Sequence, residues 1–358
     1  MSNVIALHPV PRIADPDTRI AALIACFAQH RRSEEDVFWL KENAELLNIL
    51  DCTGAATWAG IGPRALLPHV EFYASAEARL AFFPQYYRFL LSMVLDLEDL
   101  GMPGETGARM AQSIAASAAP GAELSDLQRM EARRLLARRG VSGPADLGLE
   151  DRLRGFCARP GIFALPNKKA AYELTHIVFY LSEYGRRDPR LEAEALTSLH
   201  FAGNLAFLEQ NSDLLAEVCI ALRYAGELPP PLWTGWLSRE TQLFHVETDP
   251  QGPLQDGYHD FLVCNWQLAL AGEEPFRTPL ESGRMRFDRA PRRMAPLREL
   301  SRALFAMKGR RSADWAVMRR RIEGALPPGV IDLLDLMARE TAHFDAFFEG
   351  FAREQNRF

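Results

Sequence analysis

The chain has 358 residues, of which 48% are hydrophobic and 25% are charged. These proportions are typical of a globular protein and exclude a disordered, collagen-like or coiled-coil chain. The formal net charge is −6, from 41 basic and 47 acidic residues. A chain with this balance has no general attraction for phosphate backbones or anionic lipids, so we expect neither nucleic acid nor a membrane among its partners.

The cysteines and the N-terminal segment both favour a cytoplasmic location. The five cysteines are an odd number and include no C-x-x-C pair, which fits reduced thiols better than disulfides or a zinc site. The first residues contain Pro9 and Pro11 where a secretory signal needs an apolar core. No later segment reaches about 18 consecutive apolar residues, the length that a transmembrane helix requires.

Apolar residues recur at helical intervals through nearly all of the chain, and the alternation typical of β-strands is nearly absent. The spacing predicts helices over 34–50, 84–101 and 125–139, the last with an N-cap at Ser125 or Asp126. It also predicts helices over 167–184, 192–209, 212–225, 231–244, 257–271, 296–307, 312–324 and 329–353. The Pro- and Arg-rich stretch 275–298 is expected to be a surface loop.

Helices of this length, separated by Gly and Pro, predict an all-α fold. The pattern is typical of an α/α toroid or a solenoid-like array, and an irregular helical bundle is the alternative. We expect a flexible segment at 1–16, an N-terminal helical region at 17–140, a Gly/Pro-rich connection at 141–166 and a C-terminal helical region at 167–358.

The most informative segment is 166–185. Wound as a helix, it has one apolar face, and its opposite face carries Lys169, Glu173, His176, Tyr180 and Glu183. Glu173 and His176 could chelate a metal ion together, or Glu173 could orient His176 as a general base. An aromatic-rich polar stripe of this kind favours a pocket. The alternative is a solvent-facing surface that happens to contain His and Tyr.

A second imidazole, that of His259, is predicted in the first turn of the helix over 257–271, after an N-cap at Asp256 and a turn at 245–247. The positive end of a helix favours a neutral imidazole, which can accept a proton or bind a metal ion. The alternative is a core histidine that is hydrogen-bonded to a carbonyl group.

These segments together give the candidate site. We predict one pocket with the catalytic residues His176, His259, Glu173 and Tyr180. His176, His259 and Glu173 are the predicted ligands of a divalent metal ion.

A second E-x-x-H pattern occurs at Glu340 and His343, and Glu217 lies in a run that looks buried. Helical di-iron proteins use such patterns together with further glutamates. The pattern is short, however, and a Glu-rich chain with eight histidines also produces accidental matches.

The run AYELTH (171–176), which continues through Phe179, Tyr180 and Leu181, and the pair Tyr258 and His259 resemble signatures of uncharacterised bacterial helical proteins. The whole chain, including FWLKEN (38–43) and FFPQYY (82–87), is similar to one domain-of-unknown-function family. The resemblance supports His176 and His259 as motif positions and suggests an α/α toroid by analogy. It implies no activity, because a fold does not determine a function.

Two functional hypotheses follow. The first is a cytoplasmic all-helical enzyme with a His/Glu/Tyr-lined pocket that would take a small molecule or peptide. The second is a non-catalytic scaffold that binds a protein or peptide in a concave groove, motivated by the Arg-rich stretch 284–298 and by Phe344, Phe347 and Phe348. Buried, mutually close site residues would favour the enzyme, and solvent-facing ones would favour the scaffold.

Overall fold

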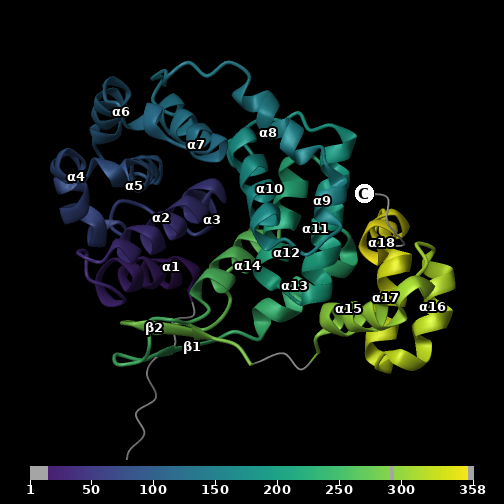
Figure 1. Ribbon diagram of the computed structural model, residues 1–358. Coiled ribbons are helices and arrows are strands. Elements are labelled where there is room, and N and C mark those ends of the chain that lie inside the picture. The colour runs from purple at the N-terminus through teal and green to yellow at the C-terminus, as the bar shows by residue number, and fades with distance from the viewer. Residues whose placement is uncertain (1–14, 291–293, 354–358) are drawn as a thin grey trace, which may run out of the picture. The chain divides into compact units, whose positions relative to one another are not determined.

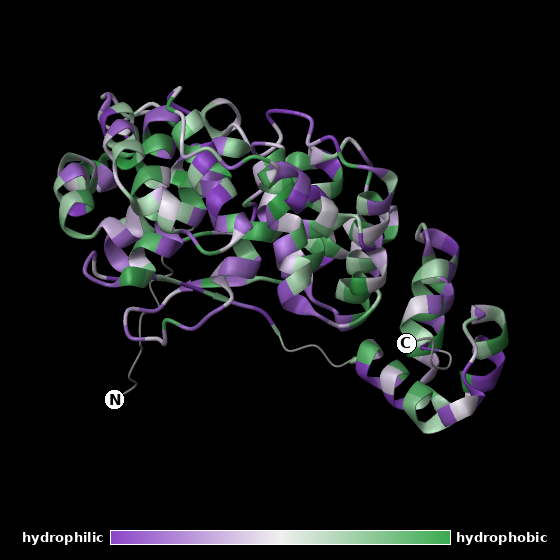
Figure 2. Cartoon of the chain, turned by 45° about the horizontal axis from the view of Figure 1, so that its top comes forward, coloured by the Kyte–Doolittle hydropathy of each residue, from purple (hydrophilic) through white to green (hydrophobic). Residues whose placement is uncertain are grey.

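The computed structural model of the protein describes residues 15–290 and 294–353. These residues form the α-helices α1 to α18 and one two-stranded antiparallel sheet (Figure 1), so the prediction of an all-α fold is confirmed. Most helices carry both hydrophobic and hydrophilic residues (Figure 2), as amphipathic helices do. Among the described residues, none of the helices combines the length and the apolar character needed to cross a membrane.

The chain folds into two compact units. Unit 1 comprises Met1–Ser113, Phe244–Leu262 and Glu274–Arg289, and unit 2 comprises Ile114–Leu243, Val263–Glu273 and Ala290–Phe358. The choice between a toroid or solenoid and an irregular bundle concerns the whole chain and stays a prediction. The expected flexible segment at 1–16 lies outside the described residues except for its last two, and α1 already begins at Pro16.

The elements of unit 1 are α1 (Pro16–Ala25), α2 (Val37–Cys52), α3 (Ala55–Trp58), α4 (Val70–Phe82), α5 (Tyr87–Asp99), β1 (His245–Thr248) and β2 (Met285–Asp288). Two helices contribute to both units, namely α6 (Thr106–Ala116) and α14 (Tyr258–Leu270). Unit 2 contains α7 (Asp126–Ala137), α8 (Leu149–Cys157), α9 (Pro160–Phe163), α10 (Lys168–Leu181), α11 (Ala193–Glu209), α12 (Ser212–Tyr224), α13 (Pro231–Gln242), α15 (Pro296–Met307), α16 (Trp315–Ile322), α17 (Pro328–Glu340) and α18 (Phe344–Ala352).

A buried arginine organises unit 1. The Arg31 guanidinium forms ion pairs with Glu42 (2.9 Å) and Asp256 (2.8 Å). It also lies over the rings of Phe27 and Tyr258, 5.2 and 5.1 Å from their centroids. Because all three charged side chains are nearly inaccessible to solvent, each needs the others to offset the cost of leaving water.

The sheet of unit 1 lies where the sequence predicts a turn and a surface loop, and both of these predictions are wrong. β1 pairs with β2 in an antiparallel register that places Val246 opposite Phe287. Val246, Met285 and Phe287 are buried, and their neighbours along each strand are more exposed. Strands of four residues are too short for the period-two pattern to stand out from the sequence.

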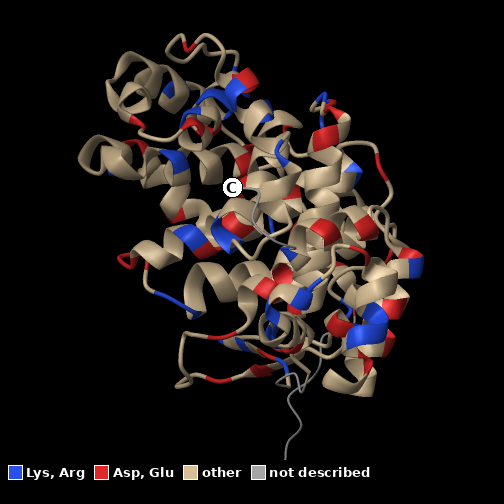
Figure 3. Ribbon diagram, turned by 45° about the vertical axis from the view of Figure 1, so that its right-hand side comes forward, with Lys and Arg blue, Asp and Glu red and all other residues tan. Residues whose placement is uncertain are grey.

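The predicted Gly/Pro-rich connection at 141–166 lies inside unit 2 and contains α8 and α9. Glycine and proline limit the length of these helices but do not prevent their packing, and Leu149, Leu153, Cys157 and Phe163 are buried. Basic and acidic residues are interspersed along the helices (Figure 3), as the near balance of charges suggests.

The predicted single helix over 329–353 is also wrong, because α17 ends at Glu340 and α18 begins at Phe344. Thr341 is extended, and its hydroxyl donates to Met337 O (2.8 Å) and contacts Asn204 Oδ1 at 3.0 Å. His343 then has a left-handed backbone with φ 58°. Glu340 and His343 therefore do not share a helix, as the di-iron pattern requires.

Candidate functional site

The candidate site of unit 2 lies where α10 packs against α12. Each helix starts at an asparagine N-cap: Asn167 Oδ1 accepts from Ala170 N (3.1 Å), and Asn211 Oδ1 accepts from Leu214 N (3.2 Å). Such caps satisfy backbone donors of the first turn and fix where the helix begins. The caps therefore set which side chains of the two first turns face each other.

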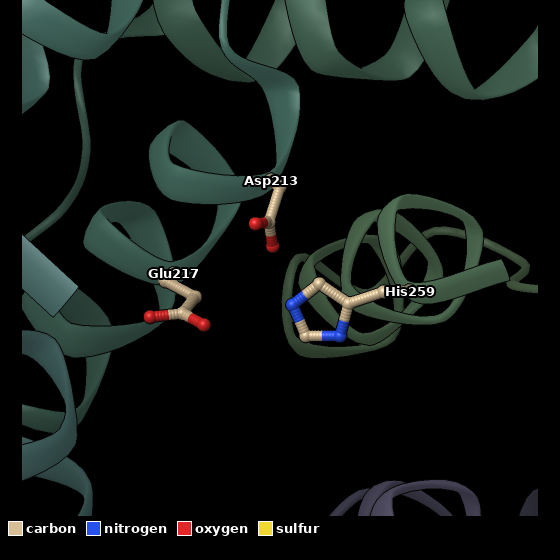
Figure 4. Close-up of side chains that lie close together, drawn as sticks. All are labelled: Asp213, Glu217 and His259. Carbon is tan, nitrogen blue, oxygen red and sulfur yellow. The ribbon is translucent and has the colours of Figure 1, made fainter. Parts of the chain in front are cut away.

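Two acidic side chains interrupt the buried helix α12. Every residue from Ser212 to Leu222 is buried, including Asp213 (7% exposed) and Glu217 (3% exposed). The two acids stand one helical turn apart (Figure 4), and a carboxylate oxygen of one lies within 4.8 Å of an oxygen of the other. Buried carboxylates are rare and need compensating partners.

α10 supplies partners for both acids. The Tyr172 hydroxyl donates to Asp213 Oδ2 (2.6 Å), and the Thr175 hydroxyl donates to Glu217 Oε2. Burial, with the adjacent charge of Asp213, raises the pKa of Tyr172 far above its usual value, so its proton stays in this hydrogen bond. We call Tyr172, Thr175, His176, Asp213 and Glu217 the α10–α12 cluster.

The third member of the cluster on α10 is His176, whose side chain is 37% exposed. Its Nδ1 lies 2.8 Å from Tyr172 O and 3.6 Å from Glu217 Oε2. A carbonyl oxygen only accepts hydrogen bonds, so Nδ1 carries the hydrogen and Nε2 of the neutral ring keeps its lone pair. His176 is thereby oriented as a base or as a metal ligand through Nε2.

Glu173, predicted to orient His176 or to share a metal ion with it, is partly exposed. Its side chain forms no hydrogen bond or ion pair with any other residue that the structure describes. The carboxylate beside the imidazole is that of Glu217. The role predicted for Glu173 stays a prediction.

Tyr180 lies beside His176, with the ring centroids 6.1 Å apart. Its ring is buried, and the guanidinium of Arg134 lies over Tyr180 at 5.7 Å and over Tyr184 at 4.7 Å. Arg134 also forms a 2.8 Å ion pair with Glu183. Tyr180 is therefore held on the same helical face as His176, as the sequence predicts for this stripe.

His259 lies in unit 1, as the second residue of α14. Its Nδ1 contacts a carboxylate oxygen, Oε1 of Glu45 on α2. Asp256, the predicted N-cap, accepts from Tyr258 N (3.3 Å) and also binds Arg31. His176 belongs to unit 2. That His259 and His176 line one pocket therefore stays a prediction.

Comparison with known proteins adds the family. A model of the family described as Domain of unknown function (DUF6902) matches residues 1–354, so the chain belongs to this family. The resemblance seen in the sequence is thereby confirmed at the level of the family. No curated protein matches the chain. No solved structure matches it either.

Sequence reasoning identified Glu217 only as a buried-looking acid and missed Asp213 and Thr175. Asp213 was missed because an acid in the first turn of a helix is common, since it interacts favourably with the positive end of the helix dipole. The signal that could have found it is the spacing of Asp213 and Glu217, four residues apart in a helix that is otherwise almost wholly apolar.

Proposed function

We propose that the protein is an enzyme whose site is the α10–α12 cluster, with Asp213 and Glu217 binding a divalent cation and His176 acting as a general base. The observation that carries the proposal is the pair of buried carboxylates one turn apart beside an oriented imidazole. Oxygen ligands suit Mg²⁺ and Mn²⁺, and a cation beside a base activates water for hydrolysis.

The hydrogen bonds of the cluster support a cation site. The hydroxyls of Tyr172 and Thr175 donate to one oxygen of each carboxylate and so fix how the two acids are oriented. A divalent cation is attracted by two adjacent carboxylates, which can both contribute oxygen ligands to it. The same hydroxyls would then orient the carboxylates, as the outer partners of metal ligands commonly do.

The phenylalanines and two of the arginines that motivated the scaffold hypothesis have partners inside their own units. Phe344, Phe347 and Phe348 are buried within unit 2. In the Arg-rich stretch, Arg284 donates to Pro250 O (2.7 Å) and Arg289 binds Asp260 (3.0 Å). Internal packing and internal hydrogen bonds account for these five side chains, which weakens the support for the scaffold, and we therefore favour the enzyme.

Titration with Mn²⁺, followed by the loss of the free-ion EPR signal, tests the cation site in the full-length chain. We expect one saturable site in the wild-type protein. The isosteric substitutions Asp213→Asn and Glu217→Gln each remove one charge and should weaken binding at least tenfold. Asp332→Asn, which changes an exposed acid of the same unit, is the matched control and should bind like the wild type.

The catalytic role is tested by hydrolysis of a panel of chromogenic carboxylic and phosphoric esters with and without Mn²⁺. His176→Gln should keep Mn²⁺ binding and lower the metal-dependent rate by about 10²- to 10⁴-fold, the usual contribution of a general base. His259→Gln tests the sequence prediction that the second imidazole takes part. A wild-type protein that binds no Mn²⁺, or variants of Asp213 that bind it normally, would refute the site.

A further inference from the structure

Unit 2 contains an apolar pocket that is separate from the α10–α12 cluster. It has a volume of about 240 Å³ and lies among α9, α10, α11, α12 and α15. Its walls include Phe163, Leu165, Ala206, Leu214 and Leu297. None of the five cluster residues lines it. The pocket therefore needs an explanation that does not depend on the function proposed above.

The charged groups at the pocket are one lysine and one glutamate. Lys168 and Glu209 form a 2.9 Å ion pair, and their side chains are 60% and 31% exposed. An ion pair this exposed contributes little to stability, and the ammonium of Lys168 has three donors, so it can bind an incoming carboxylate while it keeps Glu209 as a partner. The more exposed partner, Lys168, is the one free to turn toward an incoming charge.

The choice of lysine here is unusual for this chain. Only four of its 41 basic residues are lysines, and two of these, Lys168 and Lys169, stand side by side at the start of α10. Lysine carries a compact ammonium group on a flexible side chain and can bind a carboxylate in many orientations, whereas the planar guanidinium of arginine binds best to a partner in one fixed plane. This chemistry favours an anionic head group of one charge at the pocket mouth.

The size of the pocket sets the size of the ligand. An apolar cavity of about 150 Å³ holds benzene, so about 240 Å³ has room for roughly ten non-hydrogen atoms. The apolar walls select a hydrocarbon body, and Lys168 selects a carboxylate. We propose that this pocket binds a linear aliphatic monocarboxylate of about eight carbons, with the chain inside and the carboxylate at Lys168.

Calorimetric titration of the full-length protein with octanoate tests the proposal. We expect saturable one-to-one binding, and octylamine, which has the same chain with a cationic head, should bind at least about fivefold more weakly. Lys168→Met keeps the apolar stem and should weaken octanoate binding about three- to fivefold. Lys169→Met is the matched control, because Lys169 does not line the pocket, and should change it less than twofold.

A second variant tests the pocket itself. Ala171 lines the pocket, and Ala171→Leu should fill part of it and abolish saturable octanoate binding while the far-UV circular dichroism of the protein is unchanged. The proposal is overturned if octanoate does not saturate the wild type, if octylamine binds equally well, or if both lysine variants weaken binding equally. The Mn²⁺ titration is independent of all these outcomes.

Discussion

The buried histidine of unit 1 should make the protein sensitive to mild acid. His69 is inaccessible to solvent, and its Nε2 lies 2.8 Å from Asn43 Oδ1. The Asn43 amide group donates to Phe27 O and Trp39 O, so Asn43 Oδ1 accepts and Nε2 of His69 carries the hydrogen. Nδ1 has no hydrogen-bond partner among the described residues. Protonation at Nδ1 would therefore bury an unsatisfied charged donor.

The size of the effect follows from the pKa. Burial lowers the pKa of His69 to about 4, whereas an unfolded histidine titrates near 6.5. Between these values the unfolded chain binds the extra proton, so the free energy of unfolding falls as the pH falls. At about 1.36 kcal/mol per unit the loss is about 2 kcal/mol from pH 7.5 to pH 5 and about 3 kcal/mol by pH 4, and it is complete at about 3.4 kcal/mol below that pH.

Urea unfolding at pH 7.5 and pH 5, followed by tryptophan fluorescence, measures this loss. In His69→Gln the amide nitrogen can still donate to Asn43 Oδ1, but the side chain does not titrate. The variant should lose about 2 kcal/mol less than the wild type over this pH interval. His30→Gln, at an exposed histidine of the same unit, should follow the wild type. If His69→Gln loses as much stability as the wild type, the titration of His69 is not the cause of the acid sensitivity.

Three further substitutions or probes test the packing and the backbone. Gly203→Ala should destabilise the protein by about 1–3 kcal/mol in urea unfolding, because the added methyl group would collide with the buried Trp233 ring. Lys308→Gly should raise the free energy of unfolding by up to about 1 kcal/mol, because Lys308 has φ 50° and ψ −127°, a backbone conformation that glycine adopts more easily. Calorimetry should detect this as a higher melting temperature. Of the five cysteines, only Cys52 is not buried, so a thiol reagent should modify one thiol rapidly in the native state and all five in denaturant.

Local signals predicted most helices because the information lies within each segment. Ser125 caps α7 by accepting from Gln128 N, and α15 spans Pro296–Met307 as its apolar spacing indicates. The break between α17 and α18 could not be predicted in this way. The Thr341 hydroxyl contacts Asn204, a residue 137 positions away. The spacing of apolar residues within 329–353 carries no information about that contact.

The candidate site shows the same division between local and distant information. The helical period placed His176 and Tyr180 on one face of α10, and the structure keeps them adjacent. The period cannot say which acid meets that face. Glu173 is nearest in sequence, but Glu217, 41 positions beyond His176, is the carboxylate beside the imidazole, because α10 packs on α12.

The pairing of α10 with α12 depends on matched spacings. Tyr172 and Thr175 are three residues apart on α10, and the acids that they hold, Asp213 and Glu217, are four apart on α12. Both spacings are close to one helical turn, so two hydroxyls and two carboxylates can meet only in one register of the two helices. Because unpaired buried acids are costly, this register is strongly favoured over its neighbours. The same hydrogen bonds that fix the helices therefore also hold the carboxylates in place for a cation.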